Sequence, residues 1–242
     1  LQTTLDYALA FLKSHGAAAE LGPDYPAEGY ATVGEGQIRL RHWGEGSGRP
    51  VLVLHDIGEN GDLVDAGGDS PMIIPDLPGH GLSDALDGPV SLPAMAEMMN
   101  ALLADFGTDP VTIKAKGLSC LIAAEIQYMA PDIVAGIEME PGELSRIRDW
   151  PDYCRRRFPA LDPNAHGGHL LEAWLMVRNG ALFAPWYEQR AASIIRAESE
   201  ICPERLHRRV VALLDSLPTS HDLLASSADS PFDEHLKQAI GS

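Results

Sequence analysis

The sequence predicts an α/β protein whose central sheet is mostly parallel and contains about six strands. Short apolar runs bounded by turn residues recur along the chain, as expected of strands that lie between layers of helices. The runs are Val51–Leu54, Met72–Ile74, Val111–Ile113 and Ile133–Ile137. Segments with apolar residues at helical spacing alternate with these runs, and this alternation is typical of a parallel sheet.

The remaining elements of the first half follow from their local patterns. A helix is predicted over 3–16. Tyr30–Val33 and Gln37–Trp43 predict two strands around a tight turn. Glu59–Ser70 has too few apolar residues to anchor a full helix and is expected to be a loop or a reduced helix. Pro93–Phe106 predicts an amphipathic helix with methionines and leucines on its inward face.

Residues 111–127 predict a strand that passes directly into a helix through a corner of small residues. Val111–Ala115 has strand character, Leu121–Ile126 has the pattern of a buried helix, and Gly117 lies at the corner between them. A corner of this kind forces its middle residue into a strained conformation and projects its side chain over the sheet. The segment therefore has the shape of a nucleophile elbow.

The most specific motif in the chain is DLPGHGLSD at residues 76–84. Together with the elbow it resembles the α/β-hydrolase superfamily, and the specific resemblance covers Gln37–Gly142. It implies a three-layer α/β-hydrolase fold with an inserted all-helical cap. In that superfamily the motif is structural, because its glycines allow tight turns and its polar side chains satisfy buried backbone groups. The residues expected to fasten this loop, rather than to act in catalysis, are Asp76, Pro78, Gly79, His80 and Gly81.

The resemblance implies a serine, aspartate or cysteine at the elbow, but the sequence has Gly117 at that position. Glycine has no side chain that could attack a substrate. Ser119 is the nearest alternative, yet its use would lengthen the strand and place Leu121 where close packing requires a small residue. Cys120 would fall within the first turn of the helix and face its packing. The usual Ser-His-Asp triad is therefore not expected in this chain.

The loop after Val51–Leu54 reads His-Asp-Ile-Gly at residues 55–58. The resemblance implies that this loop supplies one of the two backbone N–H groups that hold the developing oxyanion. Asp56 replaces a glycine of the superfamily loop, and its carboxylate would repel the oxyanion unless it points away. The residues expected to form the pocket and the oxyanion-hole region are His55, Asp56, Ile57, Gly58, Gly117 and Leu118.

Helices dominate the sequence after the last predicted strand. They are expected at Gly168–Gly180, Trp186–Glu200 and Pro203–Leu217. The side chains expected to be buried by the first of them are Leu170, Leu171, Trp174, Leu175 and Val177. By its position and helicity, this region resembles the cap of the superfamily. The expected parts of the chain are an N-terminal helix and linker (1–29), an α/β-hydrolase core (30–145), a helical cap (146–217) and a C-terminal tail helix (218–242).

The tail after the expected cap lacks the two strands that superfamily members carry there. Pro218–Ser230 predicts a loop, and Pro231–Ile240 predicts one more helix. The resemblance would place the catalytic acid and the catalytic histidine after those two strands. The tail instead has polar residues that we expect at the surface, and these are His221, Asp222, Asp233 and His235.

Without further strands, the sixth strand is left at the edge of the sheet. Its segment Val134–Ile137 is apolar, and unpaired N–H and C=O groups on such an edge invite pairing or need cover. We therefore expect a homo- or hetero-oligomer, with a second copy or with an active hydrolase paralogue, or cover by the tail helix.

Composition excludes several classes of function. A net charge of −17 argues against nucleic acid as a partner. No apolar run is long enough to cross a bilayer, and the first residues lack the order of a signal peptide, so the expected location is cytoplasmic. Cys120, Cys154 and Cys202 are too widely spaced for a disulfide framework or a metal cluster. With no dinucleotide or phosphate-loop fingerprint, we expect neither a metal nor a cofactor.

Three functional readings remain open. The first is a catalytically silent, pseudoenzyme-like hydrolase-fold subunit that binds a partner. The second is an active hydrolase of an ester, acyl or related bond that uses non-standard residues in the pocket, such as His55 with Asp56 or Glu138 with Glu140. The third is a ligand-binding or sensor protein that holds a small apolar ligand under the cap without turnover.

Overall fold

The computed structural model describes residues 27–43, 49–65, 67, 70–105, 110–196 and 201–229. Several predictions lie outside these residues, namely the helix over 3–16, the tail helix over 231–240, Asp233 and His235. Within the described residues, no helix combines the length and the apolar character that crossing a membrane requires.

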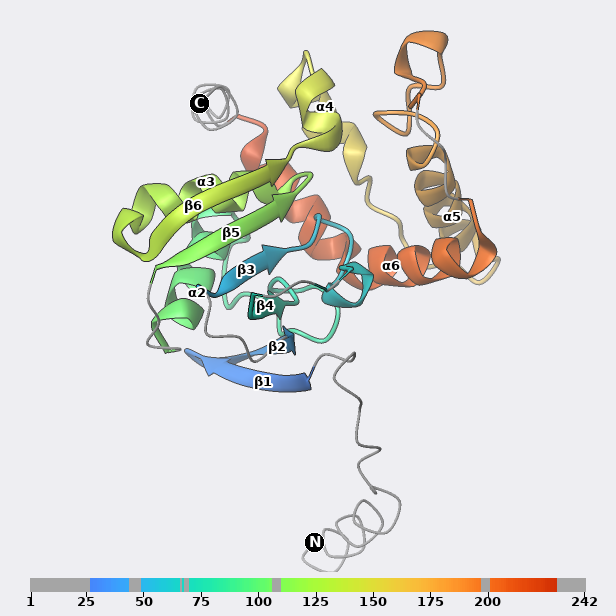
Figure 1. The fold of residues 1–242 in the computed structure, drawn as a ribbon. Helices are drawn as coiled ribbons and strands as arrows, with labels where there is room; N and C mark the ends of the chain where they lie inside the picture. Colours follow the sequence, from blue (N-terminus) through green and yellow to red (C-terminus); the bar gives the residue numbers. More distant parts are fainter. Residues whose placement is uncertain are drawn as a thin grey trace, which may run out of the picture.

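Six strands form one sheet, and they are β1 (Ala27–Val33), β2 (Gly36–Trp43), β3 (Val51–Leu54), β4 (Met72–Pro75), β5 (Val111–Lys116) and β6 (Val134–Glu140). Their order across the sheet is β1-β2-β4-β3-β5-β6 (Figure 1). The pairs β1–β2 and β2–β4 are antiparallel, whereas β4, β3, β5 and β6 run parallel to one another. The prediction of an α/β class with a mostly parallel sheet of about six strands is confirmed.

Five α-helices accompany the sheet in the described part of the chain, and they are α2 (Leu92–Asp105), α3 (Ser119–Met129), α4 (Trp150–Arg157), α5 (Gly168–Gly180) and α6 (Pro203–Ser227). Short 3₁₀ turns lie at η1 (Gly61–Leu63), η2 (Pro131–Ile133), η3 (Gly142–Arg146) and η4 (Ala191–Ser193). α2 and α3 cover one face of the sheet, while α4, α5 and α6 lie beyond the carboxyl ends of β3, β5 and β6 (Figure 1).

The two faces of β5 have opposite character. Val111, Ile113 and Ala115 are buried in the main core beneath α2 and α3. Lys114 lies on the other face, where its ammonium pairs with Glu138 of β6 at 3.2 Å. Strands covered on both faces are usually apolar throughout, so this alternation marks a parallel strand with one wet face.

The second face of the sheet has only a small apolar cluster in the described residues. Val51, Met72 and Ile74 form it, and Val64 packs against it just after η1. Where the sequence predicted a loop or a reduced helix after β3, η1 is the only helical turn among the described residues of that connection. The prediction of a reduced element at this position is confirmed.

α6 is longer than predicted, and the predicted loop at Pro218–Ser230 is wrong. The helix continues through Pro218 as far as residue 227. An interior proline removes one hydrogen bond and costs about 3 kcal/mol. Burial of Leu217, Leu223 and Leu224 offsets this cost, because each of these side chains is nearly inaccessible to solvent. The helix therefore crosses the boundary that the sequence suggested between the cap and the tail.

The predicted buried face of α5 is also wrong. Leu170, Leu171 and Trp174 are 49%, 60% and 42% exposed. Leu175 is exposed as well, and Val177 is half-buried. Ala173, Met176 and Asn179 are the buried positions. The face of α5 that packs inward is therefore the one with Ala173, Met176 and Asn179, and most of its large apolar residues face outward.

The predicted helix over Trp186–Glu200 is not formed in its described part. Ala184 N–H donates to Ser193 O at 2.9 Å, and Ile195 N–H donates to Leu182 O at 2.8 Å. These bonds tie the segment back to the chain that precedes it, so its backbone groups are paired across a loop instead of along a helix. Residues 197–200 lie outside the described part.

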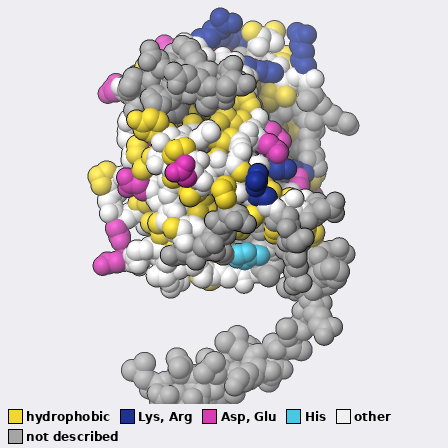
Figure 2. Space-filling view, turned by 60° about the vertical axis from the view of Figure 1, so that its left-hand side comes forward, with side chains coloured by type: hydrophobic (Ala, Val, Ile, Leu, Met, Phe, Trp, Pro, Cys, Tyr) yellow, Lys and Arg dark blue, Asp and Glu magenta, His cyan; other side chains and the backbone are white. Residues whose placement is uncertain are grey.

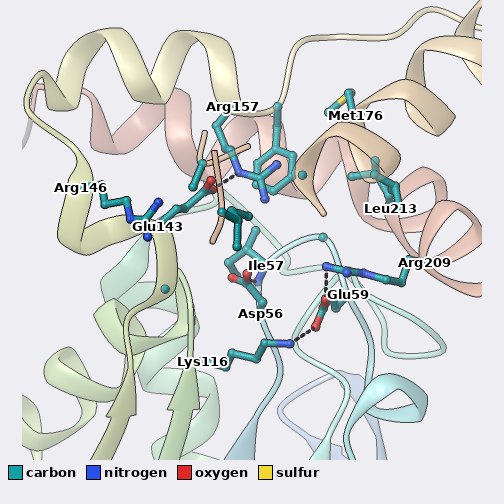
Figure 3. A pocket seen from close by; sticks show the side chains of 17 residues that line it. Asp56, Ile57, Glu59, Lys116, Glu143, Arg146, Arg157, Met176, Arg209 and Leu213 are labelled. Carbon is teal, nitrogen blue, oxygen red and sulfur yellow. Dashed lines mark hydrogen bonds and ion pairs between the residues drawn. The ribbon is translucent and has the colours of Figure 1, made fainter. Parts of the chain in front are cut away.

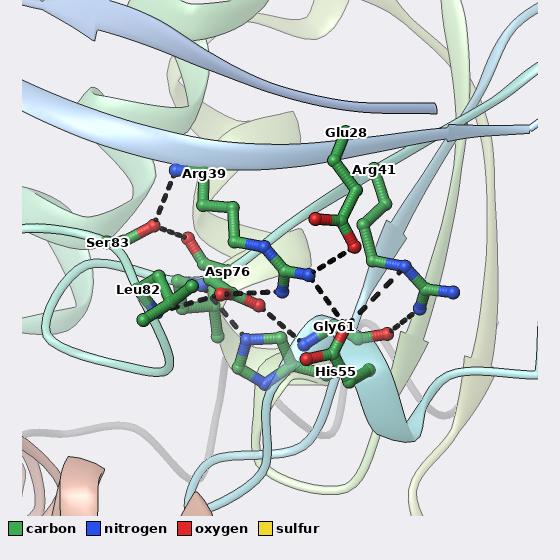
Figure 4. A network of polar contacts seen from close by, with 10 residues as sticks. Glu28, Arg39, Arg41, His55, Gly61, Asp76, Leu82 and Ser83 are labelled. Carbon is green, nitrogen blue, oxygen red and sulfur yellow. Dashed lines mark hydrogen bonds and ion pairs between the residues drawn. The ribbon is translucent and has the colours of Figure 1, made fainter. Parts of the chain in front are cut away.

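Asp76, from the DLPGHGLSD motif, is the centre of a buried polar network (Figure 4). Its Oδ1 accepts the Gly61 N–H at 2.6 Å, and its Oδ2 accepts the Leu82 N–H at 3.0 Å. The Arg39 guanidinium lies 3.2 Å from Oδ2 and also contacts Glu28 at 2.8 Å. The carboxylate thus joins β2, β4 and the loops after β3 and β4.

Two glycines of the same motif allow close approach of its neighbours. A Cβ on Gly79 would lie 2.2 Å from Thr219 Oγ1 on α6, and a Cβ on Gly81 would lie 2.3 Å from Asp76 Oδ2. Both glycines have positive φ, at 69° and 52°. Only glycine fits these positions without strain, so the motif lets α6 pack directly on the loop.

His80 is fully buried between this loop and α6. Its Nδ1–H donates to Pro78 O at 3.0 Å, and its Nε2 lies 3.4 Å from Ser220 Oγ. Burial lowers the pKa of His80 to about 3, so the ring is neutral at physiological pH. A ring held in this way is not accessible to a substrate.

Candidate functional site

The corner between β5 and α3 is filled by a carboxylate from a different strand. Gly117 has a φ of 59°, and a Cβ built on it would lie 2.3 Å from Cγ, Oδ1 and Oδ2 of Asp56. No side chain can occupy that position while Asp56 stays in place, because such contacts are far inside van der Waals distance. Asp56 therefore takes the space that a side chain at the elbow would need.

The same carboxylate binds two backbone N–H groups at the corner. Asp56 Oδ1 accepts the Ile57 N–H at 2.8 Å and the Leu118 N–H at 2.7 Å. One donor follows β3 and the other follows Gly117, which are the two places where the sequence predicted oxyanion donors. The carboxyl group points toward these donors and not away from them, so a side chain of the protein satisfies both N–H groups.

Asp56 is an unusual acid. Burial raises its pKa to about 7, and the negative charge of Glu59 adds to this shift. The Arg157 guanidinium and the Leu118 N–H act in the opposite direction and lower the pKa. In the described residues Oδ2 has no hydrogen-bond partner, and Asp56 lines a cavity. Near neutral pH the group is therefore divided between its neutral and charged forms.

The cavity next to Asp56 has a volume of about 390 Å³ and lies at the carboxyl ends of β3 and β5 (Figure 3). This is where ligands bind in open α/β sheets. α4, α5 and α6 contribute the opposite wall. The apolar lining includes Ile57, Phe158, Met176 and Leu213. The charged lining comprises Asp56, Glu59, Lys116, Glu143, Arg146, Arg157 and Arg209.

Most charges in this wall are paired with each other. Glu59 contacts Arg209 at 2.8 Å and Lys116 at 3.5 Å. Glu143 binds the Arg157 guanidinium and accepts the Tyr153 hydroxyl at 2.6 Å. These pairs join the core loops to α4 and α6, and they leave Asp56 and Arg146 as the cavity charges without an ion pair among the described residues.

Comparisons with known proteins agree with this geometry. No family model matches the chain. The solved structures that resemble it include epoxide hydrolase A from Mycobacterium thermoresistibile, with a TM-score of 0.60 and 17% identity over 89% of this chain and 78% of that chain. Cfl2 from Burkholderia cenocepacia has a TM-score of 0.61 and 14% identity over 92% and 78%. The N-acyl homoserine lactonase AidH, complexed with N-butanoyl homoserine, has a TM-score of 0.55 and 16% identity over 84% and 70%. The chain has the α/β-hydrolase fold.

Among curated proteins, the chain resembles two uncharacterized mycobacterial proteins. Rv2715 of Mycobacterium tuberculosis and Mb2734 of Mycobacterium bovis are each 34% identical to it over 94 residues. The match covers 37% of this chain, and the chain spans only 28% of the length of these relatives. These relatives therefore assign no activity to the chain.

Within the α/β-hydrolase fold, Ser119 lies in the first turn of α3 and not in the cavity. Its side chain is inaccessible to solvent, and its hydroxyl is within bonding distance of Leu54 O at 3.1 Å and Lys116 O at 2.9 Å. Cys120 is also buried, and burial raises the pKa of its thiol to about 12. Neither residue is placed as a nucleophile.

His55 does not form a pair with the Asp56 carboxylate. Its Nδ1–H donates to the backbone oxygen of Asp56 at 2.8 Å, and its Nε2 accepts the Leu77 N–H at 2.9 Å. Burial lowers the pKa of this histidine. Both ring nitrogens are therefore committed to the backbone, and the histidine fastens the loops after β3 and β4.

The other sequence candidates are also separate from the Asp56 cavity. Glu138 and Glu140 line a different cavity of about 280 Å³, together with Lys114. His221 is half-buried and does not line the cavity, and its Nδ1–H donates to Phe158 O at 2.8 Å. No histidine lines the Asp56 cavity, and no three His, Cys, Asp or Glu side chains could hold a metal ion, within the part of the chain that the structure describes.

The sequence did not predict several residues of the site. Glu59, Lys116, Glu143, Arg146, Arg157 and Arg209 all line the cavity. Four of them come from η3, α4 or α6, and the placement of these elements over the sheet depends on long-range packing. The one available signal was the concentration of arginine in the second half of the chain.

Proposed function

We propose that this chain is a catalytically silent α/β-hydrolase-fold protein that uses the cavity beside Asp56 for binding. One observation carries the proposal. The Asp56 carboxylate overlaps the position of a side chain at residue 117, and it accepts the N–H groups of Ile57 and Leu118. A single side chain thereby takes the place of both the nucleophile and the oxyanion.

The physical argument rests on charge and on donors. A tetrahedral intermediate would have to place its negative oxygen where the carboxylate already accepts two N–H groups. Loss of one oxyanion donor typically lowers kcat by about 10²–10³-fold, and loss of the triad lowers it further. The cavity also lacks a histidine within the described residues. Nothing in this wall supports a seryl mechanism.

The test is a reactivity assay on the purified chain. Intact mass after incubation with a fluorophosphonate and initial rates on a panel of activated esters are measured for the wild type and Asp56→Asn. We expect no adduct and no hydrolysis above the background rate for either protein. An adduct on a serine, or ester turnover by the purified wild type, would overturn the proposal.

A second candidate function has Asp56 as a general base. Its raised pKa of about 7 and the free Oδ2 on the cavity favour this alternative. Such an enzyme would lose activity in Asp56→Asn, and its rate would rise with pH through about 7 as the carboxyl group ionises. The same ester panel, extended to substrates that react by proton abstraction, distinguishes a general-base enzyme from a protein without catalytic activity.

The free edge of the sheet supports an association partner. β6 pairs with β5 on one side, and no described strand pairs with its other side. We propose that a second copy or a hydrolase-fold paralogue covers this edge. Native mass measurement should then show a dimer or a heteromer, with slow hydrogen exchange at Val134–Ile137. A monomer, whether its β6 amides exchange freely or are protected by the chain itself, would contradict the association.

A further inference from the structure

A second and larger cavity lies beside the first. It has a volume of about 620 Å³ and is formed by η3, α4 and the segment around η4. Arg146 and Ala184 line both cavities. The wall between the inner space at Asp56 and the outer space thus consists in part of these two residues, and a single extended ligand could contact both spaces.

The outer cavity is rich in arginine. Arg146, Arg148, Arg190 and Arg196 line it together with the carboxylates of Asp149, Asp152 and Glu188, and we call the four arginines the arginine groove. Arg190 pairs with Glu188. The other three are exposed and form no ion pair among the described residues. Neighbouring arginines outside the groove, Arg155 and Arg156 of α4, pair with Asp152.

This groove belongs to a wider asymmetry of charge. Residues 146–217 contain 11 of the 18 Lys and Arg residues, all of them arginine, but only 9 of the 35 Asp and Glu residues. The rest of the chain contains 7 basic and 26 acidic residues. Figure 2 shows Lys and Arg side chains gathered at the top of the molecule, where Figure 1 places α4. Positive charge is therefore concentrated around the groove.

The side-chain chemistry indicates the ligand. The planar guanidinium donates two parallel hydrogen bonds to a carboxylate or a phosphate, and this makes arginine the preferred residue for such groups. A net charge of −17 would repel a large polyanion at long range, which favours a small molecule. The free Oδ2 of Asp56 in the inner cavity is an acceptor for a hydroxyl or an amino group.

We propose that the two cavities together bind a small molecule with an anionic group at one end and a hydrogen-bond donor at the other. The phosphate or carboxylate lies in the arginine groove, Arg146 lies at its junction with the inner cavity, and a hydroxyl or ammonium group reaches Asp56. This inference rests on the proposed binding role of the inner cavity and specifies its ligand class. It replaces the purely apolar ligand that the sequence suggested, because the charged residues form a large part of both walls.

The anionic end is tested by calorimetric titration with inorganic pyrophosphate and with citrate at low salt. The relative affinity of the two probes distinguishes phosphate from carboxylate recognition. The variant Arg148→Ala/Arg196→Ala should weaken binding by roughly 10-fold or more for each lost charge-assisted contact. The control Arg49→Ala/Arg208→Ala removes the same charge from exposed positions outside both cavities, and it should change affinity less than about 2-fold.

The donor end is tested with a length series of ω-aminoalkyl phosphates against alkyl phosphates of matched length. At the length that spans both cavities, the amine should increase affinity for the wild type by roughly 10-fold. Asp56→Asn should abolish this gain and leave pyrophosphate binding unchanged. Absence of an amine effect at every length would overturn the inner half of the proposal.

Two results would overturn the arginine groove itself. One is no binding of either anion by the wild type at millimolar concentration, and the other is an equal loss in the control variant. Fluorophosphonate labelling separates these failures from a failure of the proposed function. Labelling with intact anion binding refutes catalytic silence alone, whereas absent anion binding without labelling refutes the groove alone.

Discussion

Two aspartates at the carboxyl ends of neighbouring strands have very different surroundings. Asp76, after β4, accepts N–H groups from Gly61 and Leu82 and also contacts a guanidinium at 3.2 Å. Asp56, after β3, accepts two N–H groups as well, but no cation from the described part of the chain is bonded to it. Its pKa is raised to about 7 by burial and by Glu59.

The difference shows what separates a structural carboxylate from one whose pKa lies near neutral pH. Hydrogen bonds alone do not offset the cost of burying a negative charge, whereas a bonded guanidinium does. Asp76 therefore anchors the fold through its ion pair with Arg39. Near pH 7 Asp56 is close to its protonation midpoint, and because its Oδ1 accepts both N–H groups, its Oδ2 faces a cavity.

The largest effect is expected at the structural carboxylate. Asp76→Ala leaves the Arg39 guanidinium and two backbone N–H groups without their buried partner, and it should lower the free energy of unfolding by about 3–5 kcal/mol. Urea denaturation measures the loss. Asp84→Ala is the control, since this exposed carboxylate accepts the Gln37 N–H at 2.9 Å and should cost less than about 1 kcal/mol. Equal losses in the two variants would mean that the buried Asp76 network contributes no more to stability than an exposed hydrogen bond.

The next effect concerns the filled corner. Gly117→Ser adds a side chain that overlaps Asp56 at a residue with a φ of 59°, and it should destabilise the protein by about 2–4 kcal/mol. In an Asp56→Gly background the overlap disappears, and only a backbone cost of about 1–2 kcal/mol should remain. A double-mutant cycle measures this coupling. Additive effects would mean that Asp56 does not occupy the corner.

A smaller effect is expected from the titration of Asp56. Its pKa of about 7 in the folded protein lies above the ordinary value of 3.8, so the folded state binds the proton more tightly than the unfolded state. Stability should therefore fall as pH rises from about 4 to 7 and then stay level. Because Asp56 faces a cavity, we expect a loss of about 2 kcal/mol from this group. Denaturation of Asp56→Asn between pH 5 and 8 should lack this slope, and parallel profiles would argue against a raised pKa.

The smallest effect is expected on the wet face of the sheet. Lys114 and Glu138 form an exposed cross-strand pair at 3.2 Å. Replacing either by alanine should cost less than about 1 kcal/mol, and added salt should reduce the difference further. A loss comparable to that of Asp76→Ala would show that this face is covered by a partner that desolvates the pair.

The sequence predicts the strands and the corner well because their signals are local. Apolar runs mark β3 and β4, and counting along the chain places Gly117 at the elbow. The sequence also predicts an aspartate beside the oxyanion donors, but not its direction. The Asp56 side chain can point toward these donors only because Gly117 has no Cβ. Gly117 follows a different strand, so the local sequence around Asp56 does not reveal this space.

The helical region is predicted less well because its packing is long-range. The apolar stripe of α5 suggests burial of Leu170 and Leu171, yet both are exposed and Ala173 is buried. Pro218 suggests a break in α6, but tertiary packing keeps the helix intact. Arg157 and Glu143 reach the cavity only because α4 lies over the ends of the strands, and no local periodicity encodes that placement.

The occupation of the two N–H groups by Asp56 can be measured directly by NMR. The amide proton shifts of Ile57 and Leu118 are followed from pH 4 to 9 in the wild type and in Asp56→Asn. Both amides should titrate together in the wild type with a midpoint near 7, and neither should titrate in the variant. If the wild-type amides do not respond to pH and exchange freely with solvent, Asp56 does not occupy the Ile57 and Leu118 N–H groups, and the account is contradicted.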